Sequence, residues 1–407
     1  MNNQIKLAVA AALLAAASSA NAGIIIPAGD WTLDIGGIVN AYYTSTRVSG
    51  SATTGYGGTY FAGAADTKTK TVSNITTGLL PNYLTVSGTT RQNDLDVGFT
   101  ISIQPGASTT TAGQQGTGTN QENRQAFITF GDKSWGSFKL GKDLGIYASD
   151  AILNDMTLLG VGSGAGGLAG NTTTTGRIGT GFMYADWKAQ VAYSTPNFNG
   201  FSATVGVTQA WDAIAVVSNS ATSTGRGGSQ PAFEGKASYD FAADAVKGKV
   251  WVSGISQKVD GLSTGVTGVT RNDRAESGDI GANINVAGFG LTGYYYAGSG
   301  IGQTVQLNGG FDTSGHTRDS DGGYVQVTYV LPTATKLGVS WGQSTLSKNS
   351  TGDTLAGDLK DEMWTIGAYH PLTKHLNLVA EYSDVKSTMA ALEGKSKTAS
   401  LGAILFF

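Results

Sequence analysis

The sequence predicts an all-β fold, a transmembrane antiparallel β-barrel of about sixteen strands. Three observations predict it. Apolar and polar residues alternate along many short segments, which is the period of a strand with one apolar and one polar face. Short and long connections between these segments alternate along the chain. The 60 Gly, 16 Tyr and only 14% charged residues suit strands that face lipid on one side and water on the other.

The start of the chain is predicted to be a secretory signal peptide, residues 1–22. Lys6 gives a positive start, residues 7–17 are apolar, and Ala22 ends a run of small residues before the expected cleavage site. The apolar run is too short to cross a bilayer as a helix, and no later run of about twenty apolar residues occurs. We therefore expect an exported protein in which residues 23–407 form one barrel domain.

Alternation is clearest in the segment 94–104, where Leu, Val, Phe, Ile and Ile occupy the odd positions and smaller or polar residues the even ones. Similar segments recur from residue 31 to the C-terminus, with no helical domain between them. The last segment alternates up to the terminal Phe407. A closed barrel would pair this last strand with the first one, because lipid offers no hydrogen bonds to an unpaired strand edge.

The connections between the expected strands are of two kinds. Short turns fall near 91–94, 131–136, 196–200, 242–244, 287–288, 332–334 and 371–375. Long polar loops fall near 48–82, 105–122, 143–180, 212–231, 260–278, 299–321, 344–358 and 387–396. Short turns at one rim and long loops at the other are typical of outer-membrane barrels. Aromatic residues beside the short turns predict an interfacial girdle, formed by Tyr193, Phe201, Phe241, Phe289, Tyr329 and Phe407.

Composition and histidine placement argue against other classes of protein. The net charge of −3 is too small to indicate a nucleic-acid partner. The histidines, His316, His370 and His375, lie in or beside connections without a Ser or Asp constellation, so we expect no enzyme. No metal-ligand spacing of His, Cys or carboxylates occurs. We expect no cofactor and no metal.

Two stretches in the first half of the chain carry a recognisable pattern. Asn-Arg-Gln-Ala-Phe-Ile-Thr-Phe at 123–130 is followed by Trp-Gly-Ser-Phe-Lys-Leu-Gly-Lys-Asp at 135–143 and by Tyr-Ala-Ser-Asp at 147–150. Val-Ala-Tyr-Ser-Thr-Pro-Asn-Phe-Asn-Gly-Phe follows at 191–201. With the C-terminal aromatic residue, these stretches resemble the fourth to seventh strands and the third loop of Gram-negative general porins.

This resemblance implies an outer-membrane protein of a Gram-negative bacterium, usually a homotrimer, in contact with membrane lipid and lipopolysaccharide. It implies passive diffusion of small hydrophilic solutes and ions through a water-filled channel. The third extracellular loop, about 143–180, would fold inward and narrow the channel, which then selects by diameter and electrostatic barrier. A substrate-specific channel, for example for sugars or organic anions, is the alternative.

The resemblance also implies a constriction with basic residues on the wall and acidic residues on the loop. Alternation places Arg124 inward and Phe127 outward, and it places Lys188 inward with Gln190. Other roles stay open: Arg124 could hold the loop through a carboxylate, Asp143 and Asp150 could cap a short helix, and Lys188 could be a solvated rim charge. The expected constriction residues are Arg124, Lys188, Arg177, Asp155, Asp150 and Asp143.

Two features depart from the family pattern. The second strand carries no arginine near 82–84, and the loop tip at 158–167 reads Leu-Leu-Gly-Val-Gly-Ser-Gly-Ala-Gly-Gly, without a second carboxylate. A less polarised constriction is therefore expected.

Overall fold

The computed structural model describes residues 23–50, 71–107, 121–164, 173–215, 220–223, 227–243, 245–350 and 352–407. The predicted signal peptide, 1–22, lies outside the described residues. Two short helical segments, α3 (Ser149–Leu153) and η1 (Met156–Leu159), lie between β7 and β8. No helix within these ranges combines the length and apolar character needed to cross a bilayer. The strands are β1 (Ile24–Ala28), β2 (Trp31–Gly50), β3 (Thr71–Thr76), β4 (Tyr83–Gln92), β5 (Leu95–Pro105), β6 (Gln121–Asp132), β7 (Gly136–Leu144), β8 (Trp187–Ser194), β9 (Phe201–Thr208), β10 (Ala232–Ala243), β11 (Val246–Ser263), β12 (Thr270–Val286), β13 (Phe289–Ser299), β14 (Asp319–Val330), β15 (Lys336–Leu346), β16 (Leu359–Pro371), β17 (Leu376–Met389) and β18 (Leu392–Phe406).

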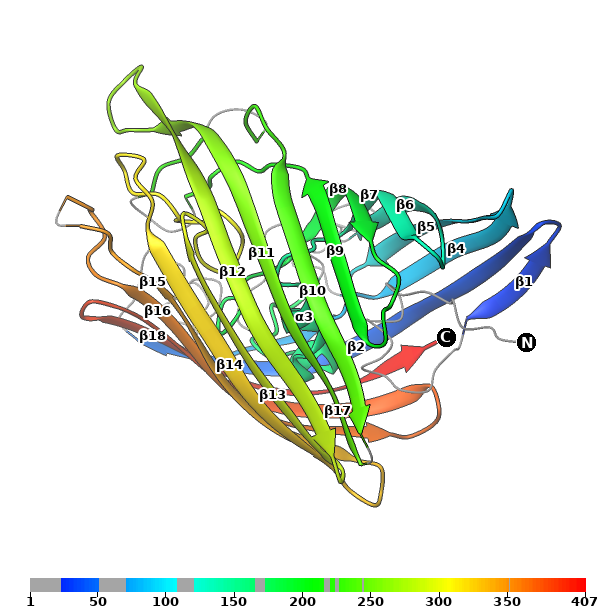
Figure 1. Cartoon of the computed structure of the whole chain (residues 1–407). Helices are drawn as coiled ribbons and strands as arrows, with labels where there is room; N and C mark the ends of the chain where they lie inside the picture. The colour runs from blue at the N-terminus through cyan, green and yellow to red at the C-terminus, as the bar shows by residue number, and fades with distance from the viewer. Residues whose placement is uncertain are drawn as a thin grey trace, which may run out of the picture.

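The strands form a closed antiparallel barrel, as predicted. The sixteen strands β2 and β4–β18 pair in chain order, and β18 returns to pair with β2. Gly37 and Phe407 exchange two backbone hydrogen bonds at the closing seam, of 2.7 and 3.0 Å. β1 and β3 are additional short strands that pair with parts of β2. The tilted strands dominate the molecule, with longer loops at one end and short turns at the other (Figure 1).

Alternation sorts the side chains between the two faces of the barrel. Along β16, residues at odd positions such as Asp361 and Met363 are buried inside, while Trp364 and Ile366 face outward. The outer face is apolar at the membrane level, as lipid contact requires. Leu401 of β18, for example, is 64% exposed.

Aromatic residues gather on the outer face near the short turns. Phe289 and Tyr329 have ring centroids 4.5 Å apart, and Tyr193 lies 5.3 Å from Phe138. Phe201, Phe289 and Tyr329 are all exposed on the outside. This arrangement matches the girdle that aromatic residues form at membrane interfaces.

The predicted bounds of two long loops, 260–278 and 387–396, are wrong because strands extend into both ranges. β11 extends to Ser263 and β12 begins at Thr270, while β17 extends to Met389 and β18 begins at Leu392. A cross-strand ion pair between Lys386 of β17 and Glu393 of β18, at 3.1 Å, supports the second extension. Charged residues can continue a strand above the membrane because its outer face then meets water. Their polarity made these segments resemble loops.

The wall is interrupted between β3 and β4. Residues 77–82, expected as the end of a long loop, are buried and held by Asn40 of β2. The Asn40 side chain accepts a hydrogen bond from the Gly78 N–H (2.9 Å) and donates one to the Leu80 carbonyl (3.0 Å). The Asn82 Oδ1 accepts a hydrogen bond from the Asn40 N–H (2.6 Å). Side-chain amides therefore replace the strand ladder at this point.

Candidate functional site

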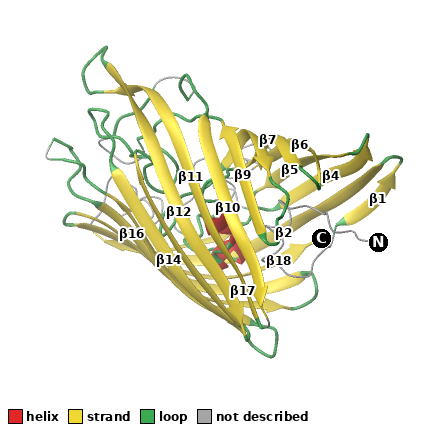
Figure 2. Ribbon diagram, in the orientation of Figure 1, coloured by secondary structure: helices red, strands yellow, loops and turns green. Residues whose placement is uncertain are grey.

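We call the connection between β7 and β8, residues 145–186, loop 3. Its described residues, 145–164 and 173–186, lie against the inner face of the barrel wall. Its range differs from the expected 143–180 because β7 continues to Leu144 and β8 begins at Trp187. Its helix α3 is drawn within the barrel outline (Figure 2). Hydrogen bonds join its described residues to β10, β11, β12, β14, β15, β16, β17 and β2.

Glu234 of β10 holds the start of loop 3. Its carboxylate accepts hydrogen bonds from the N–H groups of Ile146 (2.8 Å) and Tyr147 (2.9 Å). The same carboxylate accepts from Lys188 Nζ at 2.7 Å, and both side chains are fully buried. Lys188 also donates to Gln306 (3.1 Å). Lys188 therefore faces inward as predicted, but it is a buried ion-pair partner and not a solvated rim charge.

Asp150 lies in the first turn of α3 and joins this helix to the wall. Its carboxylate accepts hydrogen bonds from Lys236 Nζ (3.1 Å) and from Lys249 Nζ. It does not cap the helix, because the N-cap residue is Ala148, which makes no side-chain capping bond. Asp143 lies on β7, where it accepts from Gln125 (3.0 Å) and Lys139. The capping role considered for both aspartates is therefore wrong.

Burial raises the pKa of Asp150, but the charges of Lys236 and Lys249 outweigh burial and hold the pKa below its ordinary value. A carboxyl group whose pKa is lower in the folded than in the unfolded protein stabilises the folded state at pH values above its unfolded-state pKa. This stabilisation is lost as the pH falls through the folded-state pKa. We expect the stability difference between wild type and Asp150→Asn to be constant near neutral pH and to shrink below about pH 4. Thermal unfolding in detergent at a series of pH values measures it. A difference that grows on acidification would contradict the assignment.

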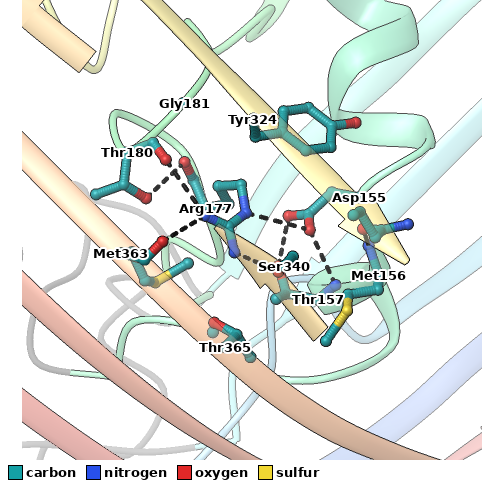
Figure 3. Close-up of polar contacts among 12 residues, drawn as sticks. Asp155, Met156, Thr157, Arg177, Thr180, Gly181, Tyr324, Ser340, Met363 and Thr365 are labelled. Atoms are coloured by element: carbon teal, nitrogen blue, oxygen red, sulfur yellow. Dashed lines mark hydrogen bonds and ion pairs between the residues drawn. The ribbon is translucent and has the colours of Figure 1, made fainter. Parts of the chain in front are cut away.

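Asp155 and Arg177 form a pair at the middle of loop 3 (Figure 3). Their side chains are fully buried, with Nε and Oδ1 3.8 Å apart. Arg177 also donates to the Met363 carbonyl (2.9 Å) of β16 and to Ser340 Oγ of β15. Asp155 caps η1 by accepting from the Thr157 N–H at 3.1 Å. The pair thus fastens the loop to the wall.

Glu381 of β17 holds the next part of the loop. Its carboxylate accepts hydrogen bonds from the N–H groups of Val161 (2.7 Å) and Gly162 (2.8 Å) and from the Tyr369 hydroxyl (2.6 Å). Sequence reasoning missed Glu381 and Glu234. Alternation along β17 and β10 placed both inward, but it could not show which loop segment each would meet.

Arg124 of β6 is also inward and buried. Its Nε donates to Glu122 at 2.8 Å, and its guanidinium lies 5.7 Å from the Trp187 ring centroid.

The prediction that Phe127 faces outward is wrong. The β5–β6 register shifts by a bulge at Ser102/Gln104, so alternation does not carry across it. Phe127 packs inside, where Lys139 Nζ lies 4.9 Å from its ring centroid.

The six expected constriction residues are therefore all buried and held in ion pairs. Arg177 and Asp155 pair with each other, while Arg124, Lys188, Asp150 and Asp143 pair with residues that were not predicted. The lysines that form ion pairs beside loop 3 reach solvent: Lys139, Lys236 and Lys249 have side chains 16%, 27% and 28% exposed. Glu122, the partner of Arg124, is 21% exposed. The inward parity of the lysines on β7, β10 and β11 was readable in the sequence.

The fold and inner wall define an outer-membrane channel protein. The profile of the Gram-negative porin family matches residues 8–389, so the chain belongs to this family and resides in the outer membrane. No curated protein matches the chain significantly.

Solved structures share the fold at low sequence identity. The outer-membrane channel DcaP of Acinetobacter baumannii has a TM-score of 0.68 and 16% identity, covering 94% of this chain and 99% of that chain. The anion-selective porin from Comamonas acidovorans has a TM-score of 0.60 and 15% identity, covering 93% and 100%. OmpF of Salmonella typhi, in complex with daunomycin, has a TM-score of 0.56 and 15% identity, covering 93% and 100%.

Proposed function

We propose that this porin is a passive diffusion channel for small hydrophilic solutes, narrowed by loop 3, with a preference for anions. The observation that carries the proposal is the unequal exposure of the two partners in the lysine–aspartate pairs beside loop 3. Lys139, Lys236 and Lys249 keep 16–28% of their side chains exposed, while Asp143 and Asp150 keep 1% and 3%. At each of these ion pairs a solute would therefore meet the ammonium group before the carboxylate.

Partly exposed lysines beside a narrow aqueous path favour anions through the electrostatic barrier they create. Each lysine keeps its acidic partner, so the expected preference is moderate. The Comamonas acidovorans porin is anion-selective by its own description. That property belongs to that protein, and the lysines are the reason to propose the same preference here.

The inward aromatic residues favour a general channel over a sugar-specific one. A sugar path needs ring faces that are open to the solute. Tyr294 and Tyr296 point inward and Tyr295 outward, but the inward pair is buried. Tyr324 packs against Phe182 of loop 3, with centroids 5.8 Å apart. These rings support loop 3 and do not form a ladder.

Homotrimer formation, with outer-membrane lipid and lipopolysaccharide around it, remains part of the proposal and rests on the family. Gly37 of β2 lies at the seam where the barrel closes, and its environment requires glycine. A Cβ at position 37 would lie 2.3 Å from the Tyr83 carbonyl oxygen and 2.7 Å from the Phe407 ring. Glycine there is needed for barrel closure.

Lys236→Gln/Lys249→Gln should shift the zero-current potential toward cation selectivity, because two exposed positive charges leave the path. Planar-bilayer recordings across a salt gradient measure this shift. Lys397→Gln is the matched control, since Lys397 is an exposed lysine on the outward parity of β18 and should leave the potential unchanged. Equal potentials for all three proteins would overturn the anion preference. Absence of any conductance from folded protein would overturn the channel itself.

A further inference from the structure

A group of buried oxygen atoms at the loop end of the inner wall has no hydrogen-bond partner within the described residues. Buried polar atoms without partners are uncommon in native proteins and each costs free energy. Several in one place therefore require an explanation, such as a bound ion or water. The atoms are both carboxylate oxygens of Asp361, Ser387 Oγ, Tyr296 Oη, Ser320 Oγ and Gln303 Oε1.

The register of the sheet brings these side chains together. Asp361 on β16 is paired with Ser344 on β15 and with Ser387 on β17, and all three side chains point inward. Side chains directly opposite each other in an antiparallel sheet have Cβ atoms about 5 Å apart. The three oxygen-bearing side chains thus form a continuous row.

A glycine extends this row to Tyr296. Gly322 lies between Tyr296 and Ser344 in the register. A Cβ at Gly322 would lie 2.7 Å from Tyr296 Cε1 and 2.8 Å from Ser344 Oγ, so the tyrosine ring covers the glycine. The ring thus reaches Ser344, the neighbour of Asp361 in the register. The Tyr296 hydroxyl therefore belongs to the same oxygen cluster.

Two loops form the roof of this cluster. The Gly181 N–H of loop 3 donates to Ser344 Oγ (3.0 Å). Gln303, in the connection between β13 and β14, donates from Nε2 to the Ser344 carbonyl (3.1 Å), which places Oε1 nearby. Apolar clusters lie beside Asp361 on the same inner face, composed of Leu346, Leu355, Leu359, Met389, Met363 and Val385.

The charge of Asp361 has no protein counter-charge nearby. No Lys, Arg or His of the described residues forms an ion pair with it, and the residue opposite it on β17 contributes the Ser387 hydroxyl. That hydroxyl does not satisfy hydrogen-bond geometry to it. A buried carboxylate without a partner is unfavourable by several kcal/mol unless its charge is removed or balanced.

We propose that this cluster binds a monovalent metal cation, such as Na⁺ or K⁺. Carboxylate, hydroxyl and amide oxygens are hard ligands that suit such ions. The cluster contains one carboxylate, which neutralises one positive charge, so a monovalent ion matches its charge. A divalent ion would leave an excess charge among Leu and Met side chains. Within the described ranges no three carboxylate, His or Cys groups gather, unlike a calcium site. Protonation of Asp361 would remove its charge but would leave the Tyr296, Ser320 and Gln303 oxygens without partners.

Crystals of the full chain grown in RbCl give the direct test. An anomalous difference peak within coordination distance of Asp361 and Tyr296 is expected. A map with no peak there, while the surrounding side chains are well defined, would overturn the proposal.

Thermal unfolding of the detergent-solubilised protein provides an independent test. Wild type should unfold several degrees higher in NaCl or KCl than in choline chloride of equal ionic strength, because a ligand of the folded state stabilises it. Asp361→Asn should lose this difference. Asp321→Asn is the matched control on the outward parity of β14 and should keep it. If Asp361→Asn does not fold, Ser387→Ala replaces it and should reduce the difference. Equal unfolding of wild type in all three salts would show that a proton, and not a metal ion, neutralises Asp361.

Discussion

Arg177→Met should destabilise the barrel by roughly 3–5 kcal/mol, because it leaves a fully buried Asp155 carboxylate without its counter-charge. The substitution also removes the hydrogen bonds to the Met363 carbonyl and to Ser340 Oγ. We expect loop 3 to loosen and the single-channel conductance to become larger and noisier. Chemical unfolding of the refolded protein and bilayer recordings measure the two effects.

The double variant Asp155→Asn/Arg177→Met distinguishes charge burial from general damage. Removing both charges should recover a large part of the lost stability, since no ion then remains unpaired. Arg271→Met is the matched control: Arg271 is 42% exposed and pairs with Asp273 on the surface, so its loss should cost less than about 1 kcal/mol. The interpretation fails if Arg177→Met and Arg271→Met behave alike.

Glu234→Ala should have an effect of similar size at the start of loop 3. Among the described residues, it leaves Gln306 and the Trp211 ring as the close partners of the buried Lys188 ammonium. It also removes the acceptor of the Ile146 and Tyr147 N–H groups. A loss of roughly 3–5 kcal/mol is expected for an uncompensated buried charge, measured by unfolding, with frequent partial closures in single-channel traces.

Glu276→Ala serves as the comparison for Glu234→Ala. Glu276 is a carboxylate on the outer face of β12 with a side chain 61% exposed, and its removal should change stability within about 1 kcal/mol. A Glu234→Ala protein as stable as Glu276→Ala would mean that Lys188 finds water or another acceptor, and the anchoring role of Glu234 would be rejected.

The barrel itself was predictable because its physical causes are local. Alternation assigns each residue of a strand to one face, and the chain-end pattern at Phe407 indicates where the last strand must pair. The prediction failed where a local pattern admits two outcomes. A run of charged residues can belong to a polar loop or to a strand that extends beyond the membrane. The segment 387–396, expected as a loop, is instead part of the hairpin between β17 and β18.

The partners of the candidate residues were not predictable for a different reason. Alternation places Asp150 on a loop and Lys249 on an inward face, but their contact depends on how far the loop reaches across the barrel. Such contacts are set by strand tilt and stagger, which a single sequence does not specify. The bulge beside Gln104 adds to this, because one extra residue reverses the facing of those that follow.

The interrupted wall at residues 77–82 links two parts of the channel. The same segment that Asn40 holds at the wall also bonds loop 3: the Leu79 N–H donates to the Gly160 carbonyl (2.8 Å), and the Thr174 N–H donates to the Gly78 carbonyl (3.1 Å). Withdrawal of loop 3 would therefore pull on a stretch of wall that has no continuous ladder to resist it. Movement of loop 3 would then both widen the conducting path and open the wall toward the lipid. The anchoring of loop 3 therefore protects the wall as well as the width of the channel.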